Sequence, residues 1–522
     1  MERPRHLLAP AALLLLAAAF ALPLPDAPLG DEATHLLAAG SLWHDGDLRF
    51  DREDLARGYQ TWSSGPRGVA LVSVTAGAGD APGVPAAAPA LVYGRPFLYP
   101  LVAAPVYGLL GPRGLRALNL ALYLAMLWLA WSRFVPADGA IASTGHPGTP
   151  AVRELRGRWA AGLVVAGLFF ASGAAIRTLR FEPEVLLMAC VFFAVALWCR
   201  VRSEPLWGWR ELVPVAAAGV LLAAAAVSEP LLALFALPPA VDLYWARRRR
   251  ASAVFVLVLI VAGLILAGTQ RRITGSWGPE LAAEARAFVG PFPLEARPAV
   301  EQSDLGPPPW KLSAEAEPAL EDPDREPAPR VASAPEAARA RPPAGLRLRQ
   351  AGWRLFWLGT GRHIGLLPYF PFALFVLGLY LADLRRPGGR SRHLLAGAFV
   401  VYLAAASLGV AGGFAAAAAP GAAGVSATGA RALALVCPVL LFLPWSLRGG
   451  RALLLPIAAA GLWTLPAVVV AASGLASDDL LELPARAPAY RVLPLELELL
   501  AAGRLPGQVA FARFPEAQGG LW

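Results

Sequence analysis

The sequence has little charge, almost no lysine and few cysteines. Only 16% of its 522 residues are charged, whereas 57% are hydrophobic and the mean hydropathy is +0.52. Soluble domains carry about 25% charged residues, so this composition excludes an ordinary cytosolic enzyme, a disordered regulator and a nucleic-acid-binding domain. Lys311 is the only lysine, and the net charge of +9 therefore comes almost entirely from arginine. In a membrane protein, such an excess commonly reports loop topology.

The three cysteines carry no recognisable chemistry. Cys190, Cys199 and Cys437 lie in or at the end of apolar runs, and no two of them have the spacing of a metal knuckle or a redox motif. We expect small buried side chains and a fold that does not depend on disulfides.

Long apolar runs dominate what remains. A hydrocarbon core needs roughly 20 apolar residues per helix, and the sequence predicts about 11 such spans on this criterion. Another apolar stretch, 97–111, is shorter and is broken by Pro100 and Pro105. It could be a re-entrant or juxtamembrane helix, or a twelfth span. The predicted spans are 7–24, 115–132, 159–178, 184–200, 211–227, 230–246, 252–269, 364–383, 394–411, 432–447 and 452–474.

The placement of arginine separates these options. With the N-terminus inside, every short inner loop holds a cluster of arginines and the short outer turns hold few, as the positive-inside rule requires. Counting 97–111 as a crossing would place the later clusters outside, so we treat it as re-entrant or juxtamembrane. The first span could instead be a cleaved signal peptide. The predicted fold is an all-α polytopic membrane protein with its C-terminus outside.

This topology divides the chain into alternating membrane and outer regions. The first outer loop is 25–114, spans two to seven occupy 115–269, and a second outer loop is 270–363. Its stretch 296–346 is rich in Pro, Ala, Glu and Arg, a composition typical of disorder. Spans eight to eleven occupy 364–474, and 475–522 form an outer tail.

The scarce acids gather on the predicted outer side. Asp31 and Glu32 follow the first span, Glu182 and Glu184 flank Pro183, and Glu229 precedes Pro230. Ionisable groups at membrane depth usually face a cavity or the protein interior, so these clusters favour a polar cavity that opens outward. Each pair could instead cap the start of a helix, where the helix dipole favours acids.

The roles of the other acids in the first outer loop and of His35 are less clear from the sequence. The acids between Asp45 and Asp54 are expected to form a solvated face. His35 lies four residues after Asp31, on the same helical face. It could be a metal ligand, a proton carrier or an interfacial side chain. Carboxylates with His35 could also hold a divalent metal.

Several short motifs in order along the chain resemble those of one membrane enzyme family. The chain resembles glycosyltransferases of the GT-C fold, in particular bacterial relatives of protein O-mannosyltransferases and aminoarabinose transferases. The motifs are Gly30-Asp31-Glu32 with Asp45-Gly46-Asp47, Gly94-Arg95-Pro96, Pro183-Glu184, Thr274-Gly275-Ser276-Trp277, Gly361-Arg362-His363, Gly429-Ala430-Arg431 and Arg491-Val492-Leu493-Pro494.

The resemblance implies a reaction and a set of roles. Such enzymes move a sugar with inversion from a polyprenyl-phosphate donor to a lipid, glycan or protein acceptor on the outer face of the bacterial inner membrane. By position, Asp31 is the base or acceptor-orienting carboxylate, with Glu32 and Glu184 as further catalytic candidates. Arginine binds phosphate oxygens bidentately. The candidates for the donor phosphate are Arg362, Arg431 and Arg95, with His35, Glu182 and His363 in support.

Two other functions fit the same sequence. A lipid-carrier transporter would show inverted repeats or broken helices meeting at mid-membrane. A non-enzymatic GT-C-like scaffold would not bring Asp31, Glu184 and Arg362 together in space.

Overall fold

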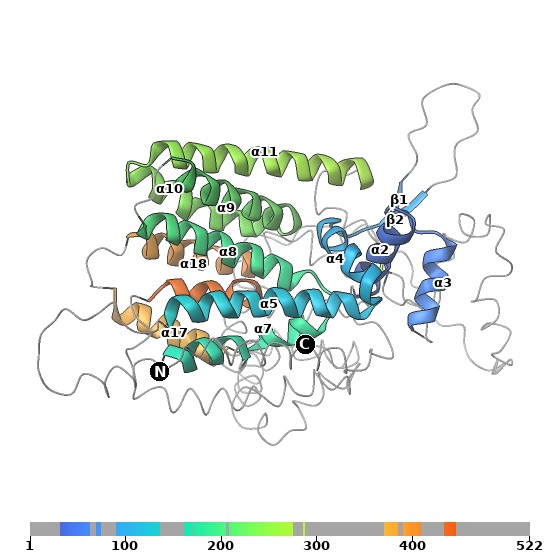
Figure 1. Ribbon diagram of the computed structural model, residues 1–522, viewed down its shortest axis with the longest axis horizontal. Helices are drawn as coiled ribbons and strands as arrows, with labels where there is room; N and C mark the ends of the chain where they lie inside the picture. Colours follow the sequence, from blue (N-terminus) through green and yellow to red (C-terminus); the bar gives the residue numbers. More distant parts are fainter. Residues whose placement is uncertain are drawn as a thin grey trace, which may run out of the picture.

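The computed structural model describes residues 32–62, 69–74, 90–135, 161–170, 172–204, 208–274, 286–287, 370–384, 390–408 and 433–444. Most of these residues are helical. In Figure 1, long helices lie side by side in a bundle, and a smaller group of short helices and strands lies beyond one end of it.

Four helices are long and apolar enough to cross a membrane. They are α5 (Arg113–Phe134), α8 (Glu184–Ser203), α9 (Trp209–Ser228) and α11 (Arg249–Thr274). At 1.5 Å per residue, about 20 residues match a hydrocarbon core about 30 Å thick. These helices coincide with the predicted spans 115–132, 184–200, 211–227 and 252–269.

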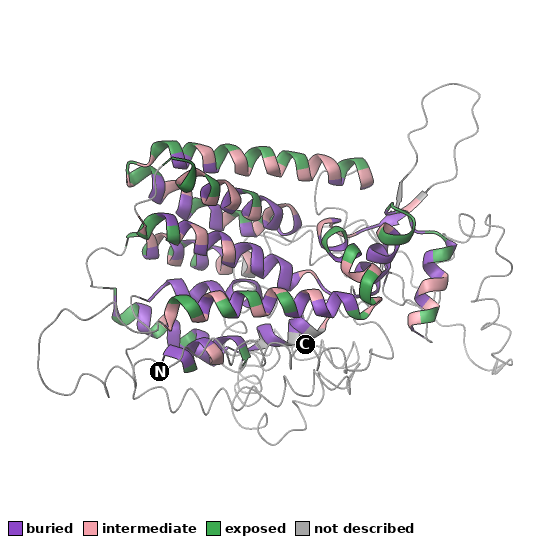
Figure 2. Ribbon diagram, in the orientation of Figure 1, coloured by how far each residue is buried: buried purple, intermediate pink, exposed green. Residues whose placement is uncertain are grey.

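The long helices differ in how much apolar surface they leave uncovered. Helix α8 is buried along most of its length, whereas α11 exposes much of its surface (Figure 2). Leu257, Leu264 and Ile265 of α11 are each 62% exposed. In water such a surface would be costly. It is the surface expected of a helix that faces lipid.

The remaining predicted spans correspond to shorter or interrupted helices, apart from 394–411, most of which lies in one helix of 19 residues. Residues 161–170 form a helix, and η2 (Pro230–Ala236) continues into α10 (Leu237–Trp245). Further along the chain are α17 (Pro371–Ala382), α18 (Arg390–Leu408) and a short helix that ends with η6 (Cys437–Phe442). The predicted spans 7–24 and 452–474 lie outside the described residues. The number of spans and the topology therefore stay predictions.

The predicted span 159–178 is wrong as one continuous helix. Ser172 has extended backbone angles, with φ −142° and ψ 157°, and precedes the short helices α7 (Gly173–Ile176) and η1 (Arg177–Leu179). Serine and glycine favour helix ends over helix interiors. The break directs Arg177 and the residues after it toward the start of α8.

The mostly helical structure agrees with the predicted all-α class, and it also contains a small sheet. Strands β1 (Ala70–Val74), β2 (Ala90–Tyr93) and β3 (Arg286–Ala287) pair antiparallel in the order β2-β1-β3. Leu71 pairs with both Tyr93 and Arg286. The sheet therefore joins two regions that the sequence assigns to separate outer loops.

Three helices surround this sheet. They are α2 (Glu32–His44), α3 (Arg52–Thr61) and α4 (Leu98–Leu110). The backbone N–H of Ala70 donates to Thr34 Oγ1 at 2.9 Å, which fixes β1 to α2. The N–H of Phe97 donates to Gln270 Oε1 at 3.1 Å, which fixes the start of α4 to the end of α11.

Helix α4 corresponds to the stretch 97–111. It lies against α2 beyond the end of the bundle (Figure 1). Its Gly108 packs so closely on Trp43 that an added Cβ would come within 2.0 Å of the indole ring. Thirteen helical residues span only about 20 Å, so the length of α4 favours a re-entrant or juxtamembrane helix over a full crossing.

Candidate functional site

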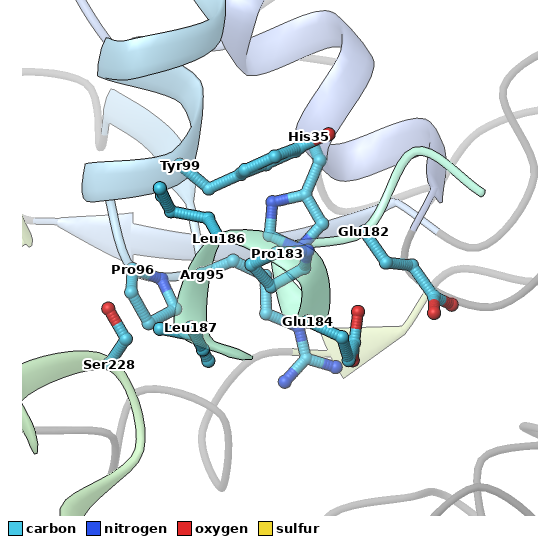
Figure 3. Close-up of a pocket in the computed structure, with 10 residues that line it drawn as sticks. All are labelled: His35, Arg95, Pro96, Tyr99, Glu182, Pro183, Glu184, Leu186, Leu187 and Ser228. Atoms are coloured by element: carbon cyan, nitrogen blue, oxygen red, sulfur yellow. The ribbon is translucent and has the colours of Figure 1, made fainter. Parts of the chain in front are cut away.

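A small polar cavity lies where the short helices meet the end of the bundle. It is formed by α2, the segment between β2 and α4, the start of α8 and the end of α9 (Figure 3). Four of the sequence-predicted residues come together here. The lining residues are His35, Arg95, Pro96, Tyr99, Glu182, Pro183, Glu184, Leu186, Leu187 and Ser228.

His35 reaches the cavity from the buried face of α2. It is 2% exposed, and its ring packs edge-on against Tyr99 with the ring centroids 5.4 Å apart. Glu32 lies three residues earlier on the same helix, so both side chains project to one face. The structure thus makes His35 a buried residue of the cavity wall and not an exposed interfacial side chain.

Glu182 is held by two arginines. Arg177 Nη1 lies 2.7 Å from Glu182 Oε2, and Arg180 Nη1 lies 3.5 Å from Oε1. Burial lowers the pKa of Arg180, but Glu182 and the nearby carboxylates Glu32 and Glu184 outweigh it, and the net pKa is raised. With its charge compensated in this way, Glu182 serves the fold of the loop and is a poor base.

The loop that carries Glu182 is also fixed through its backbone. Asn119 of α5 is fully buried, and its Nδ2 donates to the carbonyl of Arg180 at 2.8 Å and to that of Glu182 at 3.3 Å. Buried carbonyls need such donors. Asn119 therefore fixes the segment just before α8 to one position along α5.

Glu184 is the cavity carboxylate best placed for chemistry. It lies in the first turn of α8, where the helix dipole stabilises a negative charge, and it is 3% exposed. Arg95, which is half-buried, projects to the same side of the cavity (Figure 3). A carboxylate and a guanidinium facing one space can bind a hydroxyl and an anion together.

Glu32 lies beside the cavity and does not line it. It is 3% exposed, and its Oε1 accepts a long hydrogen bond of 3.4 Å from the N–H of Phe181. Arg116 of α5 stacks over the Phe181 ring with its guanidinium carbon 5.1 Å from the centroid. Glu32 is thus placed to support the loop before α8.

The other predicted site residues lie outside the described residues. They are Asp31, Arg362, His363 and Arg431. Within the described part of the chain, no group of three or more His, Cys, Asp or Glu side chains is arranged to hold a metal ion. The suggested divalent metal stays a prediction.

The cavity is small. Its volume is about 20 Å³, and a single water molecule needs at least 10–15 Å³ by this measure. It has room for about one water molecule and none for a sugar ring. A substrate would therefore need the walls to separate or would approach from outside with only one group entering.

A second charged group is formed by α3 and the loop before it. The acids at 45–54 were expected to be solvated, and Asp45, Asp47, Asp51 and Glu53 are exposed, but the side chain of Asp54 is fully buried. Arg57 forms ion pairs with both Asp54, at 2.5 Å, and Asp45. Asp51 caps α3 by accepting from the N–H groups of Glu53 and Asp54. Burial raises the pKa of Asp54 to about 7, although Arg57 lowers it.

Sequence reasoning missed the residues that hold the site together. Tyr99, Asn119 and Arg177 were not among the predicted site residues. Tyr99 and Asn119 sit in apolar surroundings, where a single buried polar residue signals a partner. Arg177 lies five residues before Glu182, and the turn between η1 and α8 brings the two together.

The described residues thus form a mostly helical protein with several helices that could span a membrane and with a charged cavity at one end. No known protein family, no curated protein and no solved structure matches the chain.

Proposed function

We propose that the protein is an integral-membrane glycosyltransferase. It moves a sugar from a polyprenyl-phosphate donor to a lipid, glycan or protein acceptor on the outer face of the bacterial inner membrane. One observation supports this most: Arg95, Glu184 and His35 come from regions far apart in the sequence and line one cavity at the bundle end. Arg95 and Glu184 belong to motifs on which the family resemblance rests, and His35 lies three residues after Glu32 of a third such motif.

The proposed chemistry is an inverting displacement. A carboxylate accepts the proton of the acceptor hydroxyl, whose oxygen forms a bond to the anomeric carbon as the bond from that carbon to the phosphate oxygen breaks. We assign proton acceptance to Asp31, with Glu184 as the second carboxylate. The leaving phosphate gains negative charge, which Arg95 can offset, with Arg362 and Arg431 as further candidates.

Transfer in proteoliposomes tests this proposal. The full chain is reconstituted with a series of polyprenyl-phosphate sugars and a pool of lipid, glycan and peptide acceptors, and labelled product is measured. Asp31→Asn and Glu184→Gln should each lower transfer by about 10²–10⁴-fold, the usual contribution of a general base. Glu53→Gln is the matched control, because Glu53 is exposed on α3 and away from the cavity. Unchanged transfer by the Asp31→Asn, Glu184→Gln double variant would refute the assignment.

The small cavity favours a second candidate, a non-enzymatic scaffold. A volume of about 20 Å³ admits no sugar, and Glu182 is already paired with arginine. A scaffold would bind a polyprenyl phosphate or a partner without turnover. Donor binding without labelled product, across the whole donor series, would favour the scaffold over the enzyme.

A further inference from the structure

The end of the bundle opposite the cavity carries several arginines that form no ion pair with the acids that the structure describes. Five of them are exposed: Arg210 at the start of α9, Arg247, Arg249 and Arg250 around the start of α11, and Arg390 at the start of α18. Among the described residues, none of the five forms an ion pair with an acid. We call these five residues, with the aromatic residues described next, the Arg–aromatic surface.

The acids at this end are already engaged elsewhere. Glu204 pairs with Arg200 at 3.2 Å, and Glu211 pairs with Arg248 at 3.1 Å. Asp242, which is 2% exposed, pairs with Arg202 at 3.3 Å. These three acids therefore do not pair with the five exposed arginines in the part of the chain that the structure describes.

Three exposed aromatic side chains stand among these arginines. Trp209, Tyr244 and Trp245 are 70%, 55% and 52% exposed. Each lies under a guanidinium: Arg210 over Trp209, Arg249 over Tyr244, and Arg390 over Trp245, at 5.4 to 5.7 Å from the ring centroids. Tryptophan and tyrosine favour the headgroup layer of a bilayer, where one side of the ring is apolar and the other is wet.

Helix length places this surface at the headgroups. Helix α11 has 26 residues and is about 39 Å long, which exceeds a hydrocarbon core of about 30 Å. Its apolar middle fits the core, so Arg249 and Arg250 reach the headgroup layer on one side. Arg271 and Arg272 reach it on the other side.

The turn before α11 keeps an arginine where glycine would be less strained. Arg247 has φ 60°, a left-handed conformation that is unfavourable for a side chain with a Cβ. The first turn of α11 contains no acid that would offset its arginines. The left-handed conformation of Arg247 and the unopposed arginines of the first turn of α11 both cost stability. The stability of the fold therefore does not explain why arginine occurs at these positions.

We propose that the Arg–aromatic surface binds the headgroups of anionic phospholipids. Guanidinium groups bind lipid phosphates bidentately, and the stacked rings fill the interface between the headgroups. This inference rests on the helices spanning a bilayer and does not depend on the proposed transferase activity.

Lipid titration in a neutral detergent tests it. The full chain is titrated with phosphatidylglycerol or phosphatidylcholine, and bound lipid is counted by native mass spectrometry. Phosphatidylglycerol should bind more tightly, and each arginine removed should weaken it about fivefold. Arg249→Gln with Arg250→Gln should therefore weaken binding on the order of 25-fold.

The same helix supplies the matched control. Arg271→Gln with Arg272→Gln removes the same charge from the other end of α11, where it should change binding less than fivefold. Equal losses for the two pairs would overturn the proposal, because they would reflect general electrostatics. Competition with inorganic phosphate distinguishes a lipid site from a site for free anions. If inorganic phosphate displaces phosphatidylglycerol at equal concentration, the surface is a site for free anions and the proposal fails.

A third variant separates binding from folding. Arg247→Gly relieves the left-handed turn, so it should leave the melting temperature unchanged or raised while it weakens phosphatidylglycerol binding. A lowered melting temperature with unchanged lipid binding would show that Arg247 serves the fold only.

Discussion

Asp54 makes the stability of the region around α3 depend on pH. Its carboxyl is fully buried, and burial raises its pKa from 3.8 to about 7. Between these values the unfolded chain releases a proton that the folded chain keeps. In this window the folded chain therefore binds more protons than the unfolded chain does. The free energy of unfolding falls as the pH rises through it. A difference of about three pKa units corresponds to roughly 4 kcal/mol.

The perturbation is Asp54→Asn, which keeps the shape and an acceptor oxygen for Arg57 but cannot ionise. Hydrogen exchange of the α3 amides, corrected for intrinsic exchange rates, measures local opening free energies at several pH values. Wild type should lose up to about 4 kcal/mol of protection between pH 4 and pH 7. The variant should lose much less, because its residue 54 does not titrate.

Glu53→Gln is the control for this experiment. Glu53 is the neighbouring acid, but it is exposed, so its removal should preserve the pH slope. The reasoning is refuted if protection rises with pH in wild type, or if Asp54→Asn and wild type show the same slope. The second result would show that Asp54 is not the source of the slope.

Three further substitutions test how the site is held. Gly167→Ala places a Cβ 2.3 Å from the Phe372 ring, so thermal unfolding should show a loss of about 1–3 kcal/mol from overpacking; an unchanged midpoint would contradict this packing. Arg177→Ala removes the shorter of the two arginine contacts to buried Glu182, and denaturant unfolding should show a loss near 3 kcal/mol, which Glu182→Gln in the same chain should partly restore. Asn119→Ala removes the donor to two buried carbonyls and should lower stability by about 1–3 kcal/mol. Hydrogen exchange should place that loss at the start of α8, and a loss spread evenly over the bundle would argue against a local role.

The long helices were predictable because hydropathy alone specifies them. The predicted span 184–200 begins where α8 begins, because Pro183 favours a helix start and the apolar run follows at once. The span 159–178 failed because an apolar composition says nothing of a break at Ser172. Length and composition therefore located most of the bundle but not its interruptions.

The sheet and much of the site depend on contacts between distant residues. Strands β1 and β2 are short runs within predicted loops, and β3 has two residues, so no local pattern specifies their pairing. The cavity was predicted in part, because acids and Arg95 were assigned to one face. The ion pair of Arg177 with Glu182 depends on the turn between η1 and α8, and the bonds of Asn119 depend on how α5 packs against that loop, so neither could be predicted.

The pairing of β1 with β3 has a consequence for biogenesis. Ala70 pairs with Ala287, and α4, α5, α8, α9 and α11 are all synthesised between these two residues. Strand β1 therefore reaches the ribosome exit long before its partner and keeps one open edge meanwhile, which is a risk for wrong pairing. Closure of the sheet can occur only after α11 has been synthesised. Formation of the β1–β3 pair would thus report that all of these helices have been made.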